Sequence, residues 1–324
     1  MNVSRRDFIC GTGSLGLVGC AEVLWGESRP LRLSPIREGG VDEVLRLTPI
    51  EIPVGASAPF GILHVSDTHL NFWDVTDYAG NAAKESFFGQ RWVRFPQALN
   101  SFLATLDYAA ERGLAVFHTG DLIDWNTAAN VNLLRRNLKG VDLFCALGNH
   151  EYHSSDGKMP ELTPDATRAR MQTVISNDLT VSSRILNGIN FVAMDNGETN
   201  LRPETVARVQ AEFAKGLPVV LLCHIPPTYT PSFLENASRM RAQILRGQGE
   251  SEAAIAKLPY PTPIESQYDD ATRTFYGWLR GQRLLKAILC GHTHVEEQDV
   301  FSETAKMYVA GGNYEGCGYV ITFK

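Results

Sequence analysis

The sequence predicts an α/β fold in which parallel and mixed β-sheet is packed between helices. Short apolar runs typical of buried strands alternate with amphipathic segments typical of helices through most of the chain. Strand-like runs then follow one another near the C-terminus. With 324 residues, of which 44% are hydrophobic, the chain can bury a large core and is compatible with one large domain.

Helices are predicted where apolar residues recur at intervals of three and four. The clearest helix begins near Leu99, and Gly113 can end it. Further helices are expected at 131–139, 164–176 and 203–216, the last with proline at its start and glycine at its end. These segments lie between apolar runs, which supports the alternating α/β pattern.

Strands are predicted where short apolar runs are bounded by turn residues. The runs lie at 60–66, 114–121, 141–149, 183–196, 218–224, 284–292, 307–312 and 318–323. Within the fourth run, Asn187 and Gly188 indicate the tight turn of a hairpin. One more strand is expected within residues 43–52.

Polar side chains that can bind metal follow five of these apolar runs. They are Asp67 and His69, then Asp121, Asn149 and His224, and finally His292 and His294. In open α/β sheets, ligands bind beyond the carboxyl ends of the strands, where loops from different strands converge. The sequence therefore predicts one site built from five strand ends.

The motifs at these strand ends resemble those of the calcineurin-like metallophosphoesterases. They read "SDTH" (66–69), "GDLID" (120–124), "GNHE" (148–151), "LCHIPP" (222–227) and "CGHTH" (290–294). The resemblance spans residues 67–294, and no core motif position is substituted. It implies a four-layer α/β/β/α sandwich with two mixed sheets and a metal site at the C-terminal ends of the strands. In motif style the chain is most similar to bacterial members that act on phosphodiesters such as cyclic nucleotides.

The resemblance also implies two sets of metal ligands that share one carboxylate. Asp67, His69 and His294 would bind the first ion, Asn149, His224 and His292 the second, and Asp121 would bridge them. Imidazole, carboxylate and amide ligands suit Mn, Fe or Zn. No cysteine belongs to this ligand set, which disfavours a closed structural zinc site. We therefore expect two divalent or trivalent metal ions as cofactors.

His150 stands beside the ligand set without being needed by it. We expect its imidazole to protonate the leaving oxygen or to stabilise the transferring phosphoryl group. Glu151 is expected to orient that imidazole and to raise its pKa. Asp124 is expected to accept a hydrogen bond from the loop backbone or from a metal-binding histidine.

Other polar and aromatic residues have simpler interpretations. His64 and His118 are expected to be hydrogen-bonded core residues, whereas His153 can be a pocket wall or a solvated loop residue. Four loop aromatics can line a base-sized pocket or pack against one another: Phe72, Trp73, Trp92 and Tyr229.

The predicted function is that of a two-metal phosphoester hydrolase, in which a metal-activated water attacks phosphorus. A small phosphodiester or nucleotide-like substrate is favoured, with an insert at 225–270 setting specificity. A phosphomonoesterase or pyrophosphatase of the same fold, and an inactive metal-binding or sensor protein, remain alternatives. The net charge of −6 and the absence of a Lys/Arg stripe argue against long nucleic acid as a partner. The sequence leaves the oligomeric state open.

The N-terminal residues 1–26 resemble an export signal. "SRRDFI" (4–9) places two arginines before a Gly-rich, weakly apolar stretch, as in twin-arginine signals, although a chance arginine pair is the alternative. "LVGC" (17–20) resembles a lipobox, which would make Cys20 the lipidated first residue. We expect a linker at 27–58, a catalytic domain at 59–324, and a periplasmic or membrane-anchored enzyme.

Overall fold

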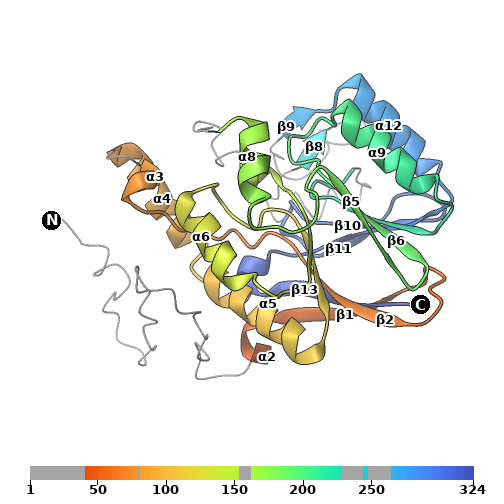
Figure 1. Cartoon of the computed structure of the whole chain (residues 1–324), viewed down its shortest axis with the longest axis horizontal. Coiled ribbons are helices and arrows are strands. Elements are labelled where there is room, and N and C mark those ends of the chain that lie inside the picture. The colour runs from red at the N-terminus through yellow and green to blue at the C-terminus, as the bar shows by residue number, and fades with distance from the viewer. Residues whose placement is uncertain (1–40, 79–80, 153–161, 228–243, 247–263) are drawn as a thin grey trace, which may run out of the picture.

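The protein folds into two facing β-sheets with helices on both outer sides (Figure 1). The computed structural model describes residues 41–78, 81–152, 162–227, 244–246 and 264–324. The expected export signal and most of the 225–270 insert lie outside the described residues. The predicted four-layer α/β/β/α sandwich with two mixed sheets is confirmed.

The first sheet has five strands in the order β1-β13-β2-β3-β4. Their bounds are Arg46–Ile52 for β1, Cys317–Phe323 for β13, Phe60–Val65 for β2, Ala115–Thr119 for β3 and Leu143–Ala146 for β4. Strands β2, β3 and β4 run parallel, whereas β13 is antiparallel to β2. The carboxyl ends of β2, β3 and β4 therefore lie at one edge of the sheet.

The second sheet has six strands in the order β11-β12-β10-β7-β6-β5. The bounds are Glu297–Val300 for β11, Lys306–Val309 for β12, Leu285–Cys290 for β10, Val219–Leu222 for β7, Ile189–Met194 for β6 and Val181–Leu186 for β5. The four central strands are parallel and both edge strands are antiparallel. A separate parallel pair consists of β8 (Ile244–Arg246) and β9 (Ile264–Gln267).

The predicted hairpin is formed by β5 and β6. Its turn residues Asn187 and Gly188 have φ values of 46° and 82°. Positive φ at both central residues is what the tight hairpin turn with Asn-Gly requires. The prediction at this position is confirmed.

The core between the sheets explains why the strands read as continuous apolar runs. In β3, Phe117 packs with Phe191 and other residues of the second sheet, whereas Val116 packs toward the helices. Because both faces of such a strand are buried, apolar residues occupy successive positions and not only alternate ones.

Helices cover the outer face of each sheet. Helices α5 (Ala98–Arg112) and α6 (Ala128–Asn137) pack on the first sheet, and α9 (Pro203–Phe213) and α12 (Asp270–Arg280) pack on the second. Shorter elements are α2 (Val41–Val44), α3 (Val75–Tyr78), α7 (Asn149–Tyr152), α8 (Pro164–Met171) and the 3-10 helix η1 (Asn313–Glu315). None of the helices in the described ranges combines the length and apolarity needed to cross a membrane.

The helices mostly match the sequence expectations. Helix α5 ends at Gly113, which adopts the left-handed conformation with φ 62°. Helix α8 is shorter than the predicted segment 164–176, and α12 was not predicted. Helix α4 (Ala82–Arg94) was also missed, because its buried face includes Lys84 and Arg91, which weaken the apolar pattern.

The expected linker at 27–58 contains part of the folded sandwich. Residues 46–52 form β1, which pairs with β13 along its whole length. Pro49 is tolerated there because β1 is an edge strand. The described part of this segment contains helix α2 and strand β1, which confirms the strand expected within residues 43–52.

Candidate metal centre

The predicted ligands all follow strands whose carboxyl ends meet at one side of the sandwich. The loops after β2 and β3 are joined by backbone hydrogen bonds: the N–H of Asp67 donates to Gly120 O (3.0 Å) and that of His69 to Asp121 O (2.9 Å). The loop after β10 joins them, because the N–H of His292 donates to Asp67 Oδ2 at 2.9 Å. Loops from both sheets thus interlock around the site.

Five of the predicted ligands have a positive φ angle, which places their backbone in the left-handed region. Positive φ values occur at Asp67 (56°), His69 (50°), Asp121 (53°), His292 (72°) and His294 (59°). Elsewhere in the described ranges, the non-glycine residues with positive φ are Asn187 and Thr199. Such strain tends to persist where the surrounding structure holds residues in a functional arrangement.

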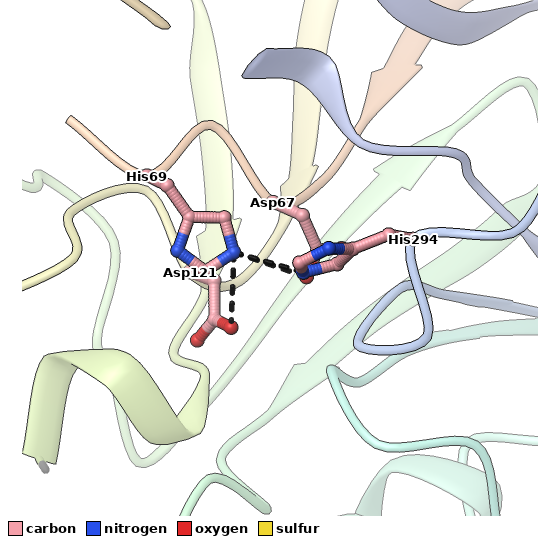
Figure 2. A group of neighbouring side chains, drawn as sticks. All are labelled: Asp67, His69, Asp121 and His294. Atoms are coloured by element: carbon pink, nitrogen blue, oxygen red, sulfur yellow. Dashed lines mark hydrogen bonds and ion pairs between the residues drawn. The ribbon is translucent and has the colours of Figure 1, made fainter. Parts of the chain in front are cut away.

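The first donor set consists of Asp67, His69, Asp121 and His294, whose ligand atoms lie within 4.8 Å of one another (Figure 2). His294 Nε2 lies 2.9 Å from His69 Nε2 and 3.2 Å from Asp67 Oδ1. Ligand atoms bound at right angles to one ion at about 2.1 Å are about 3 Å apart. The spacing of this set therefore suits a single metal ion.

The second donor set consists of Asn149, His224 and His292. Asn149 Oδ1 lies 3.1 Å from His224 Nε2 and 2.9 Å from His292 Nδ1. The two imidazole nitrogens are 3.3 Å apart. These three side chains present an amide oxygen and two imidazole nitrogens to one point, as ligands of a second ion would.

Asp121 lies between the two sets. Its Oδ2 atom is 3.7 Å from His69 Nε2 and 3.1 Å from His224 Nε2. Its Oδ1 atom accepts the backbone N–H of His150 at 2.8 Å. One oxygen is therefore anchored, while the other borders both sets in the position of a bridging ligand.

The histidine rings are oriented by contacts at the nitrogen that faces away from the site. His69 Nδ1 lies 3.0 Å from Asp124 Oδ1, and His224 Nδ1 lies 2.7 Å from Thr119 O. Both carbonyl and carboxylate oxygens accept hydrogen bonds, so each ring carries its proton on Nδ1 and leaves a lone pair on Nε2. His292 is the exception, since its Nδ1 is the atom turned toward Asn149.

The electrostatics of the site fit a cation. Asp67 and Asp121 are buried, and Asp67 Oδ1 accepts no hydrogen bond from any described residue. Burial alone would raise the pKa of Asp67, but the imidazole of His294 holds it well below its usual range. Several imidazole lone pairs and two carboxylates that meet in a buried place need a positive charge among them. The residues present therefore fit metal ions.

Comparison with known proteins decides the family. The sequence matches the calcineurin-like phosphoesterase family over residues 60–296, which include all seven predicted ligands. The chain belongs to this family. No curated protein matches the chain.

Three solved structures illustrate how far the similarity extends. A dimetal phosphatase from Danio rerio aligns with a TM-score of 0.46 and 11% identity, covering 81% of this chain and 89% of that one. A putative 5′-nucleotidase from Staphylococcus aureus aligns with a TM-score of 0.43 and 10% identity, and the alignment covers 79% of this chain and 49% of that one. Phosphopantetheinyl hydrolase from Mycobacterium tuberculosis aligns with a TM-score of 0.38 and 12% identity, and the alignment covers 79% of this chain and 90% of that one.

His150 contacts a different carboxylate from the one that was predicted. His150 Nδ1 lies 3.0 Å from Asp124 Oδ1, and its ring stands edge-on to His69 with centroids 4.6 Å apart. Asp124 thus contacts both His150 and His69, which confirms its expected place beside a predicted metal-binding histidine.

The prediction that Glu151 orients His150 was wrong. The Glu151 carboxylate accepts backbone N–H groups of Asp121 (3.1 Å), Ile123 (3.1 Å) and Gly148 (2.7 Å). Residues adjacent on a helical turn point about 100° apart, so Glu151 faces the backbone while His150 faces Asp124. Burial, followed by the charge of Asp121, raises the pKa of Glu151 to about 8. Its role is to hold the loop that carries Asp121.

Two further histidines were expected to lie in the core. His64 and His118 are buried core histidines, as expected, and hydrogen-bond to Thr119 Oγ1 (3.0 Å) and Thr68 Oγ1 (2.9 Å). Burial lowers their pKa values to about 3 and about 4.

Trp92 was expected in a loop but lies on helix α4. It packs with the loop residues Phe72 and Trp73, with ring centroids 5.2 Å and 6.3 Å apart. His153 and Tyr229 lie outside the described residues.

We predict that Asp121→Asn removes metal and activity together. The amide keeps the shape of the carboxylate but loses its charge and places N–H groups where a bridging oxygen is required. Elemental analysis of the wild-type protein should find about two transition-metal ions per chain, and the variant should have lost most of them. Asp142→Asn is a suitable control because Asp142 is a surface residue paired with Arg184. A variant that kept both ions would refute the bridging role.

Proposed function

We propose that this chain is a two-metal phosphoester hydrolase. The observation that carries the proposal is the position of Asp121 Oδ2, which borders His69 of one donor set and His224 of the other. Asp67, His69 and His294 would hold one ion, and Asn149, His224 and His292 the other. Bound metal ions of this kind supply positive charge to the phosphoryl oxygens and activate a water as the nucleophile.

His150 is the proton donor in this proposal. It is 5% exposed and its Nδ1 is engaged by Asp124, which leaves Nε2 as the atom that can reach substrate. A protonated imidazole can give its proton to the leaving oxygen as the bond to phosphorus breaks. Asp124 keeps the ring in one orientation while the proton leaves. This arrangement favours turnover over a sensor or storage role, which would not require His150.

The substrate is proposed to be a small phosphodiester or nucleotide-like compound. A pocket of about 170 Å³, partly open to solvent, has His150 in its wall. Trp125 and Tyr152 contribute aromatic surface to it, and Arg170 contributes a cation. Because the leaving oxygen must approach His150, this pocket can receive the leaving group. Phosphomonoesters and pyrophosphates are the competing substrates.

A substrate panel tests the proposed function directly. The metal-loaded protein is assayed against nitrophenyl phosphate, bis-nitrophenyl phosphate and a set of nucleotides and cyclic nucleotides. Faster hydrolysis of diesters than of monoesters supports the phosphodiesterase assignment, whereas the reverse order supports the alternative. Absence of turnover on every member, by a protein that carries two metal ions, would favour the metal-binding or sensor function.

The cellular location is proposed to be outside the cytoplasm. The support is the arginine pair at 5–6 and the "LVGC" sequence at 17–20, both outside the described residues. Export after folding would let the metal ions load before translocation. Lipidation at Cys20 would then anchor the enzyme to the membrane through its acyl chains.

We predict that His150→Ala leaves metal content nearly unchanged and lowers the rate by about 10²–10⁴-fold, the range for loss of a general acid. The loss should be large for alkyl esters and small for nitrophenyl esters, because nitrophenolate leaves without a proton. The measurement is kcat across a series of leaving groups, with metal content determined on the same samples. An equal loss for all leaving groups would assign His150 to electrostatic stabilisation instead.

We predict that Cys20→Ala moves the enzyme from the membrane fraction to the soluble periplasm without loss of activity, because the catalytic domain does not depend on the acyl chains. Replacing Arg5 and Arg6 by Lys should retain it in the cytoplasm, since the export receptor reads the arginine pair. Fractionation and mass spectrometry of the mature N-terminus are the measurements. An unlipidated mature chain that begins beyond Cys20 would disprove the anchor but not export.

A further inference from the structure

A buried arginine outside all five motifs contacts the centre of the site. Arg91, near the end of α4, is 5% exposed. Its Nε donates to Asp124 Oδ2 at 2.7 Å, and its Nη2 donates to Asp124 Oδ1. The guanidinium therefore holds both oxygens of one carboxylate in a bidentate ion pair, the geometry that arginine forms best.

Asp124 joins this arginine to the two histidines. Its Oδ1 atom lies 3.0 Å from His69 Nδ1 and 3.0 Å from His150 Nδ1, and its Oδ2 also accepts the indole N–H of Trp125 at 2.9 Å. A single buried carboxylate thus meets a predicted metal ligand, the proposed proton donor and Arg91. A rotation of this carboxylate would displace both rings at once.

The planar fork of Arg91 determines the orientation of Asp124. A guanidinium directs its N–H groups in one plane and places one donor at each carboxylate oxygen, so the Asp124 carboxylate cannot turn without losing both contacts. The carboxylate oxygens accept hydrogen bonds from their partners. Both imidazoles must then present N–H at Nδ1. Their Nε2 atoms are consequently directed toward the metal ligands and the substrate.

The same end of α4 also fixes the plane of His69. Phe95, which follows the helix, stacks on His69 with ring centroids 4.5 Å apart and an interplanar angle of 7°. The Arg91 guanidinium lies 4.7 Å from the centroid of Phe95. His69 is therefore held at its edge by Asp124 and on its face by Phe95, and Arg91 contacts both of these residues.

We propose that Arg91 is a positioning residue for the reaction. It orients Asp124 and, through it, sets the direction of His69 Nε2 and His150 Nε2. This inference rests on the proposed function for its kinetic consequences. The placement of the two imidazoles can be measured without any substrate.

The kinetic experiment compares Arg91→Met with Arg94→Met in metal-loaded enzyme. Arg94 lies one turn further along α4, is exposed, and also lies over Phe95 at 5.5 Å, which makes it a matched control. Arg91→Met should lower kcat for alkyl esters by about 10–100-fold, the usual cost of losing a partner behind the reacting groups. The loss for nitrophenyl esters should be smaller. Arg91→Lys should be intermediate, because lysine keeps the charge without the bidentate contact.

A double-mutant cycle separates positioning from a general effect on folding. If Arg91 acts through His150, Arg91→Met should cost little more in a His150→Ala background, so the two losses should not add. A loss of equal size in both backgrounds, or equal for all leaving groups, would overturn the proposed positioning of His150. If Arg91→Met fails to fold, Arg91→Lys and Arg91→Gln are carried through the same cycle.

A measurement without substrate distinguishes failure of this inference from failure of the proposed function. In zinc-loaded protein labelled with ¹⁵N at histidine, the Nδ1–H signals of His69 and His150 should shift or disappear in Arg91→Met and remain in Arg94→Met. Unchanged signals in Arg91→Met would refute the positioning role even if the enzyme is active. Changed signals in a protein that hydrolyses no phosphoester would support the role and refute the proposed function instead.

Discussion

The close approach of the loops that follow β3 and β4 is the constraint on which the site depends. At Gly148, a Cβ atom would lie 2.2 Å from Asp121 Oδ1 and 2.5 Å from the Asp121 backbone nitrogen. Because glycine leaves this space open, the Asp121 carboxylate can accept the N–H of His150 and still direct its other oxygen between the two donor sets. A side chain at Gly148 would displace the shared carboxylate and disturb both sets together.

The site also depends on loops with strained backbone conformations that are held by a rigid sandwich. A non-glycine residue in the left-handed region costs about 1–2 kcal/mol, and five of the predicted ligands adopt it. The cost is offset by a core buried between the sheets and by backbone hydrogen bonds that join the loops, such as Asp67 N–H to Gly120 O. The fold and these loop contacts therefore position the ligand atoms, which is the requirement for a precise site.

The sequence predicted that the candidate ligands lie together, because each follows a buried strand and parallel strands bring their carboxyl ends together. Their assignment to two metal ions came from the resemblance to the family. It failed where neighbours in space are not neighbours in the chain. Glu151 adjoins His150 in sequence, yet Asp124 is the carboxylate that reaches its ring. Arg91 could not be inferred, since no spacing rule relates the end of α4 to the loop after β3. The left-handed backbone at the ligands was not predicted either, because Asp and His are enriched in this region but most of them adopt other conformations.

The distribution of charge explains why a cation and then an anion should bind here. Asp124 is paired with a permanent cation, Arg91, and Glu151 is satisfied by backbone N–H groups. Asp67 and Asp121 face neutral ligands and each keeps one oxygen toward the site. Two divalent ions bound between these two carboxylates would leave a net charge of about +2. Among the residues that the structure describes, no further carboxylate joins the donor sets, so the remaining positive charge would be available for the phosphoryl oxygens of a substrate.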